Sequence, residues 1–121
     1  MHVPHPITLK ARMLSNHPPG ESLEAARRAI DETDAVVEDR DSNTLTVSAG
    51  SRLRYRLTGA GPLPLILHFD VHEEDGATVL VVTQVSDEGW YALTTRRHQE
   101  LYEDEFVELL HKLKAEGFSE T

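Results

Sequence analysis

The sequence contains no cysteine, which excludes disulfide bonds, thiolate metal sites and cysteine nucleophiles. It has few basic residues for its acidic content, because 12 Lys and Arg stand against 21 Asp and Glu and the formal net charge is −9. This charge would repel a phosphate backbone, so we expect no nucleic-acid partner. Long apolar runs are missing too, since stretches such as "VLVV" at 79–82 are far shorter than a membrane span.

Several catalytic and targeting motifs are also missing. The N-terminus lacks the basic and apolar regions of a signal peptide, so we expect a cytoplasmic protein without a membrane partner. The sequence has no nucleophile elbow, no phosphate-binding glycine loop and no dinucleotide fingerprint. We therefore assign no catalytic residue and no cofactor, name no reaction class, and favour a protein that is not an enzyme. A length of 121 residues suits one domain over 1–121, with flexible ends at 1–5 and 119–121.

Short alternating runs dominate the first two thirds of the chain. Strict alternation of apolar and polar residues predicts a half-buried strand at 7–13. "NHPPGES" ends this strand, and a short helix within 21–33 follows, with a narrow face of Leu23, Ala26 and Ile30. Turn residues then divide the chain into predicted strands at 35–40, 44–47, 52–58, 63–72 and 78–86. Residues 44–58 could instead form one long strand with a bulge at Ala49 and Gly50.

The segment 96–118 has the clearest helical periodicity in the chain. Its apolar stripe consists of His98, Tyr102, Phe106, Leu109, Leu110 and Leu113, and Gly117 suits a left-handed end to the helix. A sheet with one apolar face and a helix with an apolar stripe each need a partner, and packing them together satisfies both. The sequence therefore predicts an α+β fold: strand, helix, antiparallel meander of four or five strands, and a long C-terminal helix packed on the sheet in two layers.

This element order, over residues 6–116, resembles the helix-grip architecture of the START-related and plant-allergen-like (SRPBCC) families. Proteins of that architecture often hold hydrophobic ligands between sheet and helix. The resemblance implies that this protein binds a small apolar or amphipathic molecule there. The aromatic residues that we expect to line such a pocket are Tyr55, Phe69, Trp90, Tyr102 and Phe106. The alternative is that these aromatic side chains simply fill the core and that the scaffold has no ligand.

The stretch "LILHFDVHEEDG" at 65–76 raises the question of a metal site, because His68, Asp70 and His72 alternate with apolar residues. Residues two apart on a strand are about 6.6 Å apart, but residues four apart are about 13 Å apart. The two histidines are therefore poorly placed to share one ion. We also expect the predicted strand 52–58 to lie beside them and to repel cations. We interpret the three residues as the solvent-facing side of a strand and predict no metal.

Arg52, Arg54 and Arg56 alternate along the predicted strand 52–58. Three guanidinium groups on one face could receive an anionic group or an acidic partner surface, but we favour the plainer interpretation that they are the polar side of an amphipathic strand in an acidic protein. Our second functional hypothesis is therefore a protein-interaction module without a ligand, possible as a homodimer. It would use this arginine face or an exposed edge strand.

Overall fold

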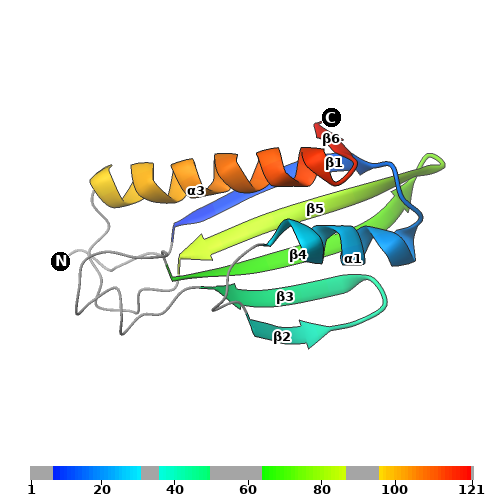
Figure 1. Cartoon of the computed structure of the whole chain (residues 1–121), viewed down its shortest axis with the longest axis horizontal. Helices are drawn as coiled ribbons and strands as arrows, with labels where there is room; N and C mark the ends of the chain where they lie inside the picture. Colours follow the sequence, from blue (N-terminus) through cyan, green and yellow to red (C-terminus); the bar gives the residue numbers. More distant parts are fainter. Residues whose placement is uncertain (1–6, 31–35, 50–63, 87–95, 121) are drawn as a thin grey trace.

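The computed structural model describes residues 7–30, 36–49, 64–86 and 96–120. Within these residues two helices lie on one face of a six-stranded antiparallel sheet, as Figure 1 shows. In chain order the elements are β1 (Thr8–Ser15), α1 (Pro19–Ala29), β2 (Val36–Arg40), β3 (Thr44–Ala49), β4 (Leu65–Glu74), β5 (Ala77–Ser86), α3 (Arg96–Ala115) and β6 (Phe118–Glu120). The predicted α+β fold with a C-terminal helix packed on an antiparallel sheet is confirmed. No helix in the described ranges is long and apolar enough to span a membrane.

The strands lie in the order β2-β3-β4-β5-β1-β6. The longest pairing joins β4 to β5, from Leu65 opposite Ser86 to Glu74 opposite Ala77. A tight turn connects these two strands, and both of its residues have positive φ, +52° at Asp75 and +79° at Gly76. Two residues of positive φ match the right-handed twist of the flanking strands, which explains why "DG" produces a regular ten-residue hairpin.

Alternation along the central strands separates the two faces of the sheet. On β4 the inward side chains are buried, namely Leu65, Leu67, Phe69 and Val71. The alternate residues Ile66, His68, Asp70 and His72 point to the opposite, outer face, where the last three are exposed. The predicted assignment of this strand's faces is therefore confirmed. The inner face of the sheet, together with Tyr102, Phe106, Leu109 and Leu113 of α3, forms the core.

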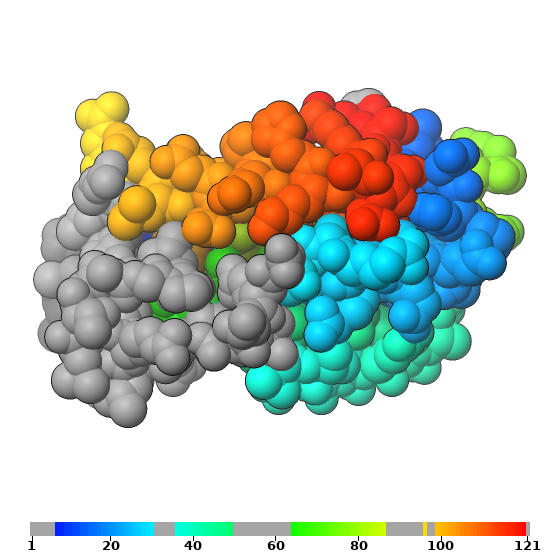
Figure 2. Space-filling view, in the orientation of Figure 1, coloured from blue at the N-terminus to red at the C-terminus, as the bar shows by residue number. Residues whose placement is uncertain are grey.

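Both helices pack on this inner face. Tyr102 and Leu113 of α3 are fully buried, and α1 contributes Leu23 and three alanines to the same core. Alanine lets a helix approach closely, and α1 contacts both β4 and α3. In Figure 2, α1 (cyan) lies against the C-terminal half of α3 (orange to red). Helix α1 begins at Pro19, two residues before the predicted segment, because proline suits the first turn of a helix.

The C-terminal end contains a strand that the sequence pattern did not predict. Gly117 ends α3 with a φ of +101°, as expected, and Phe118–Glu120 then forms β6 beside β1. Phe118 is only 3% exposed, so this strand adds to the core. Other expectations fall outside the described residues, among them the strand 52–58 and the continuation of β3 beyond Ala49. The question of one bent strand or two at 44–58 therefore stays a prediction.

Candidate functional site

Three of the five predicted pocket residues lie in the core between the sheet and α3. Phe69 is 1% exposed, Tyr102 is 0% exposed and Phe106 is 8% exposed. Tyr55 and Trp90 lie outside the described residues. The structure thus brings Phe69, Tyr102 and Phe106 into one hydrophobic cluster.

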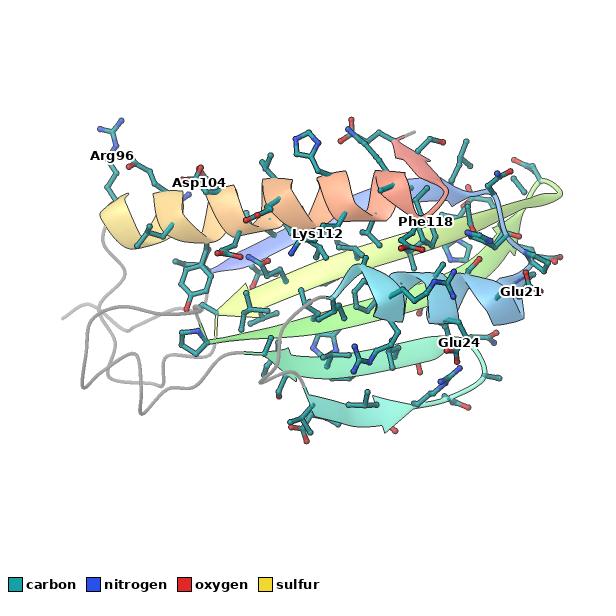
Figure 3. All side chains as sticks on the ribbon, in the orientation of Figure 1. Glu21, Glu24, Arg96, Asp104, Lys112 and Phe118 are labelled. Carbon is teal, nitrogen blue, oxygen red and sulfur yellow. The ribbon has the colours of Figure 1, made fainter. Side chains whose placement is uncertain are left out.

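A crevice opens between the C-terminal end of α1, the middle of α3 and the sheet. Its volume is about 30 Å³, which is room for a water molecule or one small chemical group. Six apolar and four polar residues line it: Ala29, Ile30, Ala49, Leu65, Leu67, Leu109, Gln84, Glu105, Glu108 and Lys112. Figure 3 shows Lys112 on the side of α3 that faces α1. The crevice therefore has apolar walls, half of them from the sheet and the rest from the end of α1 and from α3, with three charged residues of α3 at its rim and Gln84 on the sheet.

Gln84 is the buried polar residue of this crevice, with 1% of its surface exposed. Its side-chain nitrogen donates a 3.0 Å hydrogen bond to the backbone carbonyl of Tyr102. Because a carbonyl can only accept, the amide must present its nitrogen there, and its oxygen is the remaining acceptor. Among the described residues no partner is found for that oxygen. A buried acceptor without a donor is costly, so a donor entering the crevice would be stabilised.

Tyr102 uses its hydroxyl group within the protein. The phenolic oxygen donates a 2.8 Å hydrogen bond to the carbonyl of Pro64, and both groups are buried. Together with the bond from Gln84, this contact anchors α3 to the ends of β4 and β5. Tyr102 is therefore a positioning residue for the helix, and its hydroxyl hydrogen is already engaged.

Glu105 lies on the rim of the crevice and is partly buried. This burial raises the pKa of Glu105, the negative charge of Glu108 raises it further, and Lys112 acts in the opposite direction. Glu105 consequently holds a proton more readily than an exposed glutamate does. A protonated carboxyl group can donate a hydrogen bond, which an ionised one cannot.

The residues of the suspected metal site face solvent on the outer side of the sheet. His68 Nδ1 lies 3.1 Å from Thr46 Oγ1, and His72 lies 3.7 Å from Asp70 Oδ1 and 3.1 Å from Glu74 Oε2. Hydrogen bonds from Arg12 and then His72 lower the pKa of Glu74. In the part of the chain that the structure describes, no group of three or more His, Asp or Glu is arranged to hold a metal ion.

The prediction that the strand 52–58 lies beside β4 was wrong. The strands that flank β4 are β3 and β5, so Thr44 lies opposite Asp70 and Thr46 opposite His68. Because β3 and β5 pair with β4 on its two sides, neither side of β4 is left for a further strand from Leu65 to Asp70. Arg52, Arg54 and Arg56 lie outside the described residues, and their proposed role as an interaction surface stays a prediction.

Gln84 and Glu105 were missed by sequence reasoning. A signal for Gln84 was present: the inward positions of β5 read Leu80, Val82 and Gln84, so a polar residue occupies a position that the alternation assigns to the core. Glu105 carries no comparable signal, since glutamates are common on helix surfaces. Only the packing of α3 against α1 and the sheet brings its carboxyl group to the crevice.

Comparisons with known proteins identify the fold and nothing more specific. Neither a protein-family model nor a curated protein matches the sequence. Among solved structures, protein MLL2253 from Mesorhizobium loti superposes with a TM-score of 0.57 at 12% identity, covering 90% of this chain and 95% of that one. ChR145 from Cytophaga hutchinsonii superposes with a TM-score of 0.53 at 17% identity, covering 94% of each chain. Ara h 8.0201 gives a TM-score of 0.49 at 10% identity, covering 92% of this chain and 97% of that one. The first two likenesses show a shared fold.

Proposed function

We propose that this protein binds a small amphipathic molecule in the layer between the sheet and α3. The observation that carries the proposal is the amide oxygen of Gln84, a buried acceptor without a partner among the described residues, in a crevice with apolar walls. A ligand that ends in an N–H or O–H group would donate to this oxygen and place apolar atoms against Leu65 and Leu67. Specificity would come from the unpaired acceptor, because ligands without a donor would leave it unsatisfied.

The size of the crevice limits what it can hold. About 30 Å³ accommodates one polar group, whereas a site for a whole drug-sized ligand measures about 300–1,000 Å³. The apolar body of the ligand would therefore lie beyond the crevice, and Tyr55 and Trp90 remain its proposed contacts. Phe69 and Phe106 would touch the ligand only if the two layers separated, because each is at most 8% exposed.

The proposal can be tested with 1-naphthylamine, a fluorescent probe that has an apolar ring system and ends in a single amino group that donates N–H. We expect a saturable rise in probe emission and quenching of Trp90, the sole tryptophan in the sequence. Ala29→Leu would fill the crevice and weaken binding by at least about fivefold. Ala115→Leu adds the same group at an exposed position of α3 and should leave binding unchanged.

Ala49→Val provides a second obstruction from the sheet side, on a strand that tolerates β-branched residues. Each variant should keep the circular dichroism spectrum of the parent. The proposal fails if the probe does not bind saturably. It also fails if a folded Ala29→Leu or Ala49→Val protein binds as tightly as Ala115→Leu.

A second candidate function, self-association through an edge strand, is favoured by the exposure of β2. This strand forms one edge of the sheet, all five of its residues are exposed, and Val36 and Val37 are 55% and 43% exposed. An exposed edge with apolar side chains can pair with another chain. Sedimentation across a concentration series would then show a dimer that Val37→Lys weakens and Val107→Lys, at an exposed position of α3, does not. A monomer at every concentration would exclude this function.

A further inference from the structure

The outer face of the sheet, opposite the helices, carries a groove that the proposed function does not use. Its volume is about 390 Å³, against about 30 Å³ for the crevice on the inner face. The groove is lined by Lys10 from β1, by His68, Asp70 and His72 from β4, and by Val81 and Thr83 from β5. A volume of this size falls within the range of about 300–1,000 Å³ found for small-molecule sites.

The strand register explains the shape of the groove. Lys10, Thr83 and His68 form one row across β1, β5 and β4, and Arg12, Val81 and Asp70 form the next row. The short side chains of β5 form the floor, and the longer side chains of β1 and β4 form the walls. These walls stand on strands about 9.6 Å apart, which is two strand spacings.

Ion pairs cross the sheet beyond one end of the groove. Arg12 on β1 reaches across β5 to Glu74 on β4, and His72 Nε2 lies 3.1 Å from the same carboxylate. In the register Arg12 lies opposite Val81 and Glu74 opposite Ala77, so this bridge crosses β5 near Val79. The floor residues Thr83 and Val81 are two positions apart on β5, or about 6.6 Å, which suits a small molecule better than an extended peptide.

The other end of the groove presents hydrogen-bond donors. Among the described residues Lys10 has no ion-pair partner, so its ammonium group is available to a ligand. The Nδ1 atom of His68 is engaged by Thr46 at 3.1 Å, which leaves Nε2 for the groove. The hydroxyl of Thr83 lies between them in the same row. Asp70 stands in the next row, and its Oδ1 lies 3.7 Å from His72 Nδ1. Because the carboxylate of Asp70 repels anions, an anionic group is favoured only at the Lys10 end of the groove.

We propose that this outer groove binds a small organic carboxylate. Its carboxylate group contacts Lys10 Nζ, His68 Nε2 and Thr83 Oγ1, and its apolar body lies over Val81 toward the Arg12–Glu74 bridge. The donors and the half-buried valine floor supply the two kinds of contact that such a molecule needs.

The test is a titration of the full-length protein with benzoate, followed by NMR of methyl groups and backbone amides. Val81 and Val82 are neighbours on β5 that face opposite sides of the sheet, since Val81 lines the groove and Val82 is fully buried in the core. We expect the Val81 methyl signals to shift saturably and the Val82 methyl signals to stay in place. Benzamide, which has the same ring without the charge, should bind more weakly.

Matched charge variants complete the test. Lys10→Gln should raise the dissociation constant for benzoate about two- to fivefold, because an exposed charge pair contributes about that much to binding. Lys10→Arg keeps the positive charge and should bind benzoate as the parent protein does. Lys114→Gln removes the same charge from α3, where Lys114 pairs with Glu120 at 3.3 Å, and should have no effect. Equal effects of Lys10→Gln and Lys114→Gln, shifts at Val82 instead of Val81, or equal binding of benzamide would each overturn the proposal.

Discussion

Replacing Gly117 by alanine is expected to destabilise the protein, because the added methyl group would collide with His17, which follows β1. Gly117 follows α3 with a φ of +101°, and a β-carbon added there would lie 2.7 Å from His17 Nε2. His17 is held in place, because its ring contacts the carbonyl of Glu116 at 2.5 Å and packs edge-on against Phe118 at 5.9 Å. The new methyl group must therefore displace the ring or shift the backbone.

The expected cost has two parts. A non-glycine residue at positive φ costs about 1–2 kcal/mol. Loss of the hydrogen bond between His17 and Glu116 adds about 0.5–1.5 kcal/mol. Gly117→Ala should thus lower the free energy of unfolding by about 1.5–3.5 kcal/mol. Gly76→Ala is the matched control, since Gly76 has a φ of +79° and nothing within 4 Å of its added β-carbon. Gly76→Ala should lower the free energy of unfolding only by the cost of a non-glycine residue at positive φ, about 1–2 kcal/mol.

Urea unfolding followed by far-UV circular dichroism measures both changes on one scale. The double variant His17→Ala with Gly117→Ala isolates the contact, because without the ring the cost of the alanine should fall to that of Gly76→Ala. If Gly117→Ala costs no more than Gly76→Ala in the parent protein, the argument that His17 locks this turn is refuted.

Three further predictions concern the core and the crevice. Tyr102→Phe leaves the buried carbonyl of Pro64 without its donor and should cost about 1–3 kcal/mol in urea unfolding, without changing the fold. Leu113→Ala should cost about 2–5 kcal/mol because Leu113 is 0% exposed, whereas Val107→Ala, at 53% exposed, should change stability by less than about 0.5 kcal/mol. Burial raises the pKa of Glu105 above its ordinary value of 4.5, so the folded state holds the proton more tightly. Stability should therefore fall as pH rises from 4.5 through the raised value, and Glu105→Gln should remove that fall in a pH series of unfolding curves.

The elements with strong periodicity could be predicted from the sequence. Helix α3 and strand β4 were predicted together with the side that is buried, because apolar spacing along one segment reports that side, and β5 was predicted as a strand. Strand β6 did not emerge, because three residues are too few to show a period. In its pairing with β1, Phe118 lies opposite Ser15. The residues around Phe118 do not indicate this partner, because the two positions are far apart in the sequence.

The candidate sites were less predictable than the fold. Gln84 could have been singled out as a polar residue at a core position, but its partner, the carbonyl of Tyr102, is 18 residues away on another element. The outer groove depends on the rows formed by β1, β5 and β4, so no single strand reveals it. His68 was considered as a metal ligand, whereas its register beside Thr83 and Lys10 favours contact with an anion.

The sequence by itself determined the helix α3 and the strand β4 with their buried sides, since the spacing of apolar residues follows from the geometry of each strand and helix. It also excluded cysteine chemistry. Only the tertiary structure decided that β3 lies beside β4, that Gln84 lacks a second partner within the described residues, and that the outer face holds the larger space. The physical reason is that register and gaps arise from packing between residues far apart in the chain, where no local pattern constrains them.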